Sequence, residues 1–214
     1  MSKARPALPF ADYQRVFRVI KTVLDGVEAN TPNACVFFSI VGATILQEIY
    51  KKKCVPIAGA AIFALDDGHQ NTILTFGRIN AGQLQGSKQS FHCWILCENQ
   101  VIDFMAPIFR ESLHSGGFPI NCARKMFQKP LAEMVPDHTD VSLPGHFYLE
   151  ANLELTREIL HNFGSRVSNR DLTDVCLHWY KKPPKTIQKN LAMASDDGSL
   201  MNMKLSELEL IGAW

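Results

Sequence analysis

Three residues whose types suit nucleophilic catalysis, Cys35, His92 and Asp103, occur in that order along the 214-residue chain. A cysteine attacks carbonyl carbons as its thiolate. A histidine can take the thiol proton while a carboxylate fixes the orientation of the imidazole. Together these residue types predict a site that hydrolyses or transfers acyl groups. The prediction requires the fold to bring all three side chains to one place.

The sequence around Cys35 favours a reactive thiol. Apolar residues on almost every side predict a buried helix over residues 34–52, and Asn33 is placed to cap its start. Cys35 would then lie in the first turn, where free backbone N–H groups and the helix dipole stabilise a thiolate. The same N–H groups can receive the oxyanion of a tetrahedral intermediate. Taken alone, Cys35 is more simply interpreted as one more small buried residue.

His92 and Asp103 fall on two predicted strands, residues 89–97 and 101–104, that would form a hairpin. Alternation places His92 and Trp94 on one face of the first strand. A two-residue turn would pair Trp94 with Asp103 and leave His92 and Asp103 as diagonal neighbours on that face. A turn with an odd number of residues would separate them. The hairpin register is therefore what allows the imidazole and the carboxylate to act together.

The remaining elements predict an α+β domain, in which helices are followed by antiparallel strands and then by helices again. The apolar spacing predicts further helices over 11–27, 152–163 and 168–180, and further strands over 55–65, 72–76, 126–135 and 203–214. Pro130 suits a strand at the edge of the sheet. We expect a single domain over residues 1–214, with a core over 11–135 and a C-terminal helical part over 147–214 that packs on it.

The composition excludes several classes of protein. With 46% hydrophobic and 20% charged residues the chain resembles an average globular domain, and its net charge of +1 comes without a basic stripe, so we expect no nucleic-acid partner. No apolar run reaches membrane-spanning length and the N-terminus lacks a signal peptide's apolar core, so we expect no membrane partner and a cytoplasmic location. The oligomeric state stays open. In such a chain we expect reduced cysteines, namely Cys35, Cys54, Cys93, Cys97, Cys122 and Cys176.

A zinc site is the main alternative for the residues around His92. Cys93 and Cys97 would lie about 13 Å apart on a strand, too far to share one ion, and alternation turns His92 away from both. We therefore expect no metal and no cofactor. His114 is predicted to lie in a loop, where it is more simply interpreted as a solvated residue than as one that flanks the pocket. His178 is predicted to lie near a helix C-terminus, where the dipole favours it.

The order of these residues resembles the papain-like clan of cysteine enzymes, most closely its transglutaminase-like branch, which includes the arylamine N-acetyltransferases. The resemblance rests on a cysteine at the start of a buried helix, on His-x-Trp at residues 92–94, and on a strand that ends at Asp103 and is followed by Pro107. It covers about residues 30–107. The whole sequence is also similar to an uncharacterised bacterial family usually placed in this clan.

The resemblance implies a papain-like or transglutaminase-like fold, in which a central buried helix carries Cys35 and packs on an antiparallel sheet that carries His92 and Asp103. It implies that Cys35 is the nucleophile, His92 the general base and then acid, and Asp103 the orienting carboxylate. The substrate would be an amide, ester or thioester in a peptide or a small acyl compound, and no cofactor would be needed. The alternative is a catalytically inactive binding or interaction protein that retains the fold.

Papain-like enzymes usually place a glutamine or a similar oxyanion donor a few residues before the nucleophile. The candidates for this role here are Asn30 and Asn33. The resemblance also makes Trp94 a candidate wall of the pocket.

Overall fold

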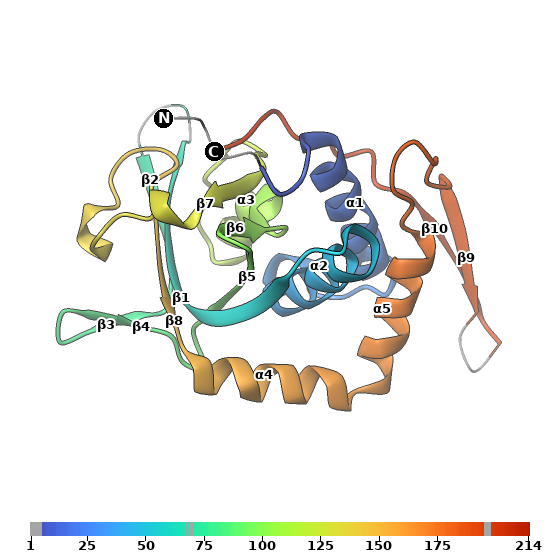
Figure 1. Cartoon of the computed structure of the whole chain (residues 1–214), viewed down its shortest axis with the longest axis horizontal. Coiled ribbons are helices and arrows are strands. Elements are labelled where there is room, and N and C mark those ends of the chain that lie inside the picture. The colour runs from blue at the N-terminus through green and yellow to red at the C-terminus, as the bar shows by residue number, and fades with distance from the viewer. Residues whose placement is uncertain (1–5, 67, 69–70, 195–197) are drawn as a thin grey trace.

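The computed structural model describes residues 6–66, 68, 71–194 and 198–214. It is a mixed α+β structure in which a curled antiparallel sheet packs beside helices, as the sequence predicted (Figure 1). No helix in these described ranges is long and apolar enough to cross a membrane.

Two buried helices pack together beside the sheet. Helix α1 (Phe10–Gly26) turns one apolar face inward, because its buried residues recur at helical spacing. Helix α2 (Cys35–Tyr50) is apolar almost all round and contacts α1, the sheet and the C-terminal helices, so it is the central helix that the sequence predicted. Both helices match their predicted ranges to within a few residues.

The main sheet has six strands, in the order β2-β1-β5-β6-β7, with β8 paired to the other edge of β1. The strands are β1 (Cys54–Asp66), β2 (Asn71–Phe76), β5 (His92–Cys97), β6 (Gln100–Asp103), β7 (Phe127–Pro130) and β8 (Phe147–Ala151). Strand β7 ends at Pro130 on the edge of the sheet, as its proline predicted. The segment predicted to be a helical C-terminal part therefore begins with a strand of the main sheet.

Strand β1 is the element on which the sheet is built. Its first half pairs with β5 and its second half with β2, while β8 runs along the opposite edge. Gly59 is the residue at which these partners meet, because it pairs with both His92 and Ala151. A Cβ at this position would lie 2.0 Å from the carbonyl oxygen of Glu150, so only glycine allows the strands to approach this closely.

The β5–β6 hairpin has the predicted register. Cys97 pairs with Gln100 and Ile95 with Ile102, so the turn contains two residues. Glu98 in the turn has a φ of 57°, in the left-handed region that tight hairpins require.

The C-terminal third contains helices α4 (Leu153–Ser165) and α5 (Val167–Trp179), which match the predicted helices, and the hairpin β9 (Asn190–Ala194) with β10 (Leu200–Lys204). The predicted strand over residues 203–214 is wrong, because β10 ends at Lys204. Side chains of α1 satisfy the backbone beyond it: Arg18 donates to the carbonyl of Leu208, and Gln14 accepts from the N–H of Leu210. Backbone pairing returns at the end of the segment, where a single parallel bridge joins Ala213 to Met126 and Trp214 donates to the carbonyl of Met126.

The expectation that every cysteine is reduced is wrong for two of them. Cys54 and Cys97 face each other across β1 and β5 and are joined by a disulfide. Reduced cysteines were expected from the size of the chain and the expected cytoplasmic location, whereas the strand register sets this pair directly opposite one another. The free cysteines, all buried, are Cys35, Cys93, Cys122 and Cys176.

Candidate active site

His92 and Asp103 form the centre of the site. The Nε2 atom of His92 lies 2.6 Å from Oδ2 of Asp103, and neither side chain is exposed to solvent. His92 begins β5 and Asp103 ends β6, so the two-residue turn of the hairpin brings them together, as its even length predicted.

Hydrogen bonds from neighbouring residues hold both the side chain and the main chain of Asp103. Its Oδ1 atom accepts a hydrogen bond from the N–H of Met105 at 2.9 Å. Its main-chain carbonyl accepts one from the hydroxyl of Tyr13, on α1, and that hydroxyl also accepts from the N–H of Phe127 at 3.3 Å. The carboxylate therefore has little freedom to turn away from His92.

Aromatic rings surround the imidazole of His92. The ring of Phe76 stacks on it with centroids 4.3 Å apart, and the rings of Phe63 and Phe109 are steeply inclined to it, with centroids 5.7 and 5.8 Å away. The face of the Phe76 ring attracts a cation, whereas burial among the rings disfavours the protonated imidazolium. Packing on three sides also fixes the plane of the ring.

Cys35 is the first residue of α2, but Asn33 does not cap this helix. A short 3-10 helix, η1 (Thr31–Asn33), contains Pro32 as its second residue, and the chain then enters α2 through Ala34, without a side-chain cap. The expected cap is therefore wrong, although Cys35 lies in the first turn as predicted. Ser112, on helix α3 (Phe109–Ser115), ties this segment in place by donating to the carbonyl of Pro32 at 2.6 Å.

Cys35 and His92 are electrostatically coupled. A hydrogen bond from Cys93 lowers the pKa of the Cys35 thiol, and burial raises it. The nearby His92 lowers this pKa further, to about 5. Burial alone would lower the pKa of His92, but Asp103 and Cys35 outweigh burial and raise it to about 10. At neutral pH the pair is therefore a thiolate and an imidazolium.

The second ring nitrogen of His92, Nδ1, is the atom left to serve Cys35, because Nε2 is bonded to Asp103. Nδ1 is buried and has no partner at normal hydrogen-bond geometry among the described residues. Its contact with the thiol is thus loose. Such contacts are common in catalytic sites without substrate and tighten when substrate binds.

Cys93 is the residue of this site that the sequence did not identify. Strand alternation had placed it on the face opposite to His92, yet Cys35 interacts with both side chains. The thiol of Cys35 therefore lies at the beginning of β5, where it reaches two consecutive residues. The hydrogen bond to Cys35 and burial raise the pKa of Cys93 well above its ordinary value, so Cys93 remains a neutral thiol that donates to the thiolate.

The other predicted site residues lie as follows. Asn33 donates from its side chain to Oδ1 of Asn30 at 3.2 Å, and both residues are exposed. Trp94 is only 3% exposed and belongs to the hydrophobic core. His114 lies in α3 rather than in a loop, with Nε2 3.1 Å from the carbonyl oxygen of Ile120. His178 lies in the last turn of α5, as predicted.

No group of three or more histidine, cysteine, aspartate or glutamate side chains within the described ranges is arranged to hold a metal ion. The fold and the site together define an α+β protein in which a buried thiol, an imidazole and a carboxylate interact in series.

The chain belongs to the family described as "Protein of unknown function (DUF2026)", whose model matches residues 9–214. It is also similar to a solved structure described as "The crystal structure of genomics APC5867", with 32% sequence identity, a TM-score of 0.84 and complete coverage of both chains. No curated protein matches the chain.

Proposed function

We propose that this protein is a cysteine hydrolase or acyltransferase of the papain-like or transglutaminase-like kind, acting on an amide, ester or thioester. The observation that supports the proposal is the series formed by Cys35, His92 and Asp103, in which the imidazole is bonded to the carboxylate and coupled to the thiol. Of the free cysteines, Cys35 is the one whose pKa is lowered; burial raises the pKa values of Cys122 and Cys176. Selective activation of one thiol is what nucleophilic catalysis requires.

The first half-reaction starts from the Cys35 thiolate and the His92 imidazolium. The thiolate sulfur bonds to the substrate carbonyl carbon, and the carbonyl π electrons move to the oxygen. When the tetrahedral intermediate collapses, the bond to the leaving group breaks and the His92 proton passes to that group. The products are a Cys35 thioester and a neutral leaving group, and Asp103 keeps the imidazole oriented throughout.

The second half-reaction resolves the thioester. Neutral His92 takes a proton from water or from an amine, and the oxygen or nitrogen so activated attacks the thioester carbonyl. The carbon–sulfur bond then breaks, which restores the Cys35 thiolate and leaves the proton on His92. Water gives hydrolysis and an amine gives acyl transfer.

Backbone N–H groups at the start of α2 are the proposed oxyanion donors. The first N–H groups of a helix have no acceptor within it, and the first α-helical bond here runs from Phe38 to Ala34. The N–H groups of Cys35 and Val36 are therefore suited to the role, because the side chains of Asn30 and Asn33 bond to each other.

Substrate would approach along the first turn of α2. A pocket of about 290 Å³ borders this turn and lies between α2 and the α4–α5 corner. Apolar side chains line one part of this pocket, and a guanidinium group and two side-chain amides line the other part. The lining residues are Val36, Phe37, Ile159, Asn162, Phe163, Arg166 and Asn169.

One observation favours the second candidate function, an inactive binding or interaction protein with the same fold. Cys35 is 7% exposed and His92 is fully buried, so a carbonyl group reaches the thiol only after a small local opening. The two functions differ in whether Cys35 forms a thioester.

The test is the rate at which iodoacetamide alkylates each free cysteine, followed by mass spectrometry of the intact protein and its peptides. We expect Cys35 to react at least about tenfold faster than Cys122 and Cys176 near neutral pH, since it alone is a thiolate there. His92→Ala should move the Cys35 pH profile toward that of an ordinary cysteine, with a pKa of about 8.5. His161→Ala, which removes an exposed histidine on α4, is the matched control and should leave the profile unchanged.

Trapping separates the two functions. With p-nitrophenyl acetate, the enzyme should release a burst of nitrophenolate and carry one acetyl group on Cys35, and Cys35→Ala should show neither. If Cys35 reacts no faster than Cys122 and Cys176, the enzyme proposal fails. A fast-reacting Cys35 that never becomes acylated would favour the binding protein.

A further inference from the structure

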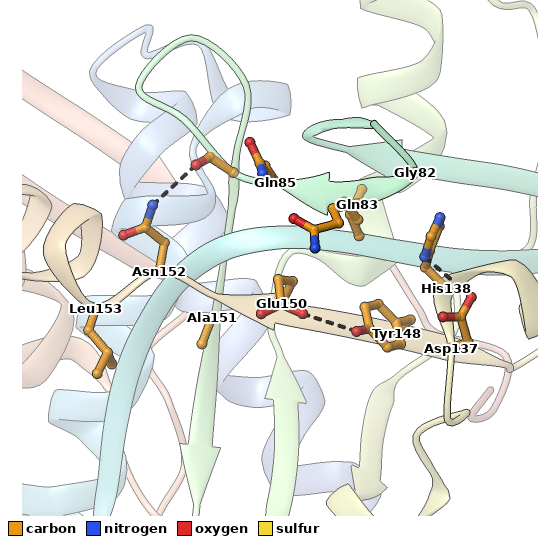
Figure 2. A pocket seen from close by; sticks show the side chains of 12 residues that line it. Gly82, Gln83, Gln85, Asp137, His138, Tyr148, Glu150, Ala151, Asn152 and Leu153 are labelled. Carbon is orange, nitrogen blue, oxygen red and sulfur yellow. Dashed lines mark hydrogen bonds and ion pairs between the residues drawn. The ribbon is translucent and has the colours of Figure 1, made fainter. Parts of the chain in front are cut away.

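A polar cleft of about 570 Å³ lies away from Cys35. It runs along β8, which pairs with one edge of β1, whereas the strand that carries His92 pairs with the opposite edge. One wall is β4 (Gln83–Gln85), which pairs with β3 (Arg78–Asn80), and the other is β8. We call it the β4–β8 cleft; Figure 2 shows the side chains that line it. Its volume falls within the range of sites that hold small ligands.

The two walls are fixed to one another at one end. Asn152 donates from Nδ2 to the carbonyl of Gly86 at 3.2 Å, and its Oδ1 accepts from the N–H of Leu155 as the cap of α4. At the other end Asp137 and His138 close the cleft (Figure 2), with Nδ1 of His138 3.3 Å from Oδ1 of Asp137. The cleft is thus built by segments that are far apart in the sequence.

Each wall presents polar side chains at alternate positions. Gln83 and Gln85 share one face of β4, and Tyr148 and Glu150 share one face of β8, with the hydroxyl of Tyr148 donating to Glu150 at 3.0 Å. Alternate residues on a strand are roughly 7 Å apart. A ligand that contacts both positions on each wall is therefore longer than a single small ring.

The chemistry of the lining restricts the ligand. The described residues that line the cleft include no lysine or arginine, and the carboxylates of Asp137 and Glu150 would repel an anion. The lining is mainly polar, which disfavours a lipid chain. Two neutral amides, on Gln83 and Gln85, both donate and accept hydrogen bonds, whereas the amide of Asn152 already bonds Gly86 and Leu155.

A ligand that carries hydroxyl groups matches this lining better than a cationic ligand does. A hydroxyl also donates and accepts, so it can use both ends of an amide and both carboxylates, whereas an ammonium group only donates. The rings of Tyr148 and His138, with centroids 6.0 Å apart, add apolar faces on which the C–H groups of a sugar ring can rest. We propose that the β4–β8 cleft binds a neutral oligosaccharide of two or three units.

The proposal is tested by isothermal titration of the full chain with cellotriose, maltotriose and triacetylchitotriose, and with trilysine as a cationic probe. At least one trisaccharide should bind with a Kd below about 1 mM. Gln83→Ala and Glu150→Ala should each weaken that binding roughly tenfold, because each removes hydrogen bonds to the ligand. Asp171→Ala, which removes an exposed carboxylate on α5, should have no effect.

Three results would overturn the proposal: no trisaccharide binds, binding is unaffected by both wall variants, or trilysine binds in a Glu150-dependent way while the sugars do not. Thermal unfolding of each variant shows whether it is folded, and both substituted wall residues are exposed. Cys35→Ala should bind the trisaccharide as well as the unaltered chain does. The result is therefore independent of the proposed acyl chemistry.

Discussion

The hydroxyl of Tyr13 donates a hydrogen bond to the main-chain carbonyl of Asp103, from a position 90 residues earlier in the chain. Burial raises the pKa of Tyr13 well above its ordinary value, so the group stays protonated and keeps donating. Helix α1 thus holds the strand end that carries the carboxylate of the candidate triad.

Replacing Tyr13 with phenylalanine should lower the free energy of unfolding by about 1–3 kcal/mol, because it leaves the buried carbonyl of Asp103 and the N–H of Phe127 without a partner. Urea denaturation measures the change. Tyr148→Phe is the matched control, since the hydroxyl it removes bonds the exposed Glu150, and it should cost less than about 0.5 kcal/mol. Equal losses in the two variants would contradict the role given to Tyr13.

The coupling of Cys35 and His92 predicts how stability depends on pH. The pKa of Cys35 is lowered from 9.0 to about 5, so its contribution is complete above pH 9.0 and is lost as the pH falls through 5. The pKa of His92 is raised from 6.5 to about 10, so its contribution is complete below pH 6.5 and is lost as the pH rises through 10. Their sum is greatest between about pH 6.5 and pH 9.

Denaturation of the unaltered chain and of Cys35→Ala across this pH range checks the prediction. The difference in their free energies of unfolding should increase from about pH 5 to pH 9, because the variant lacks the Cys35 thiol, whose contribution is lost as the pH falls through 5. A difference that stays constant over the whole range would mean that the pKa of Cys35 is not lowered by folding.

Cys93→Ala should raise the pKa of Cys35, because it removes the thiol that donates to the thiolate. A hydrogen bond to a charged group is worth about 1.5–3 kcal/mol, which corresponds to roughly one to two pKa units. The pH profile of Cys35 alkylation measures the shift, and Cys122→Ala is the control. If the profile is the same in both variants, Cys93 does not stabilise the thiolate.

The disulfide between Cys54 and Cys97 closes a loop of 43 residues. Loop-closure entropy assigns such a crosslink about 4 kcal/mol of stabilisation. Adding a reductant should therefore lower the denaturation midpoint of the unaltered chain and leave that of the Cys54→Ser, Cys97→Ser double variant unchanged. An unaltered chain that does not respond to reductant would contradict the prediction.

The parts of this molecule that the sequence could predict depend on local periodicity. The spacing of apolar residues defined α1 and α2, and alternation with a two-residue turn was enough to bring His92 to Asp103. Cys35 at the start of a buried helix followed from the same kind of pattern.

The parts that it could not predict depend on packing between distant segments. The contact of Cys35 with Cys93 requires α2 to lie over the beginning of β5, and the disulfide requires the register of β1 against β5. The cap at Asn33 failed for a local reason, since Asn33 is the last residue of the 3-10 helix that contains Pro32, and Ala34 stands at the N-cap of α2. Hydrophobic patterns specify neither the register between remote strands nor the way in which a proline directs a short turn.

Gly59 pairs with His92 on one edge of β1 and with Ala151 on the other, so the candidate triad and the β4–β8 cleft share one stretch of backbone. A substitution in this stretch would disturb two functions together, whereas substitutions in either wall would disturb one. A deep mutational scan can rank variants once by acyl chemistry and once by ligand binding. At the centre of β1 the two rankings should therefore agree. At the exposed wall residues Gln83 and Gln85 the two rankings should be uncorrelated, because substitutions there leave the core packing intact, so variation at these positions can change the ligand without altering the chemistry.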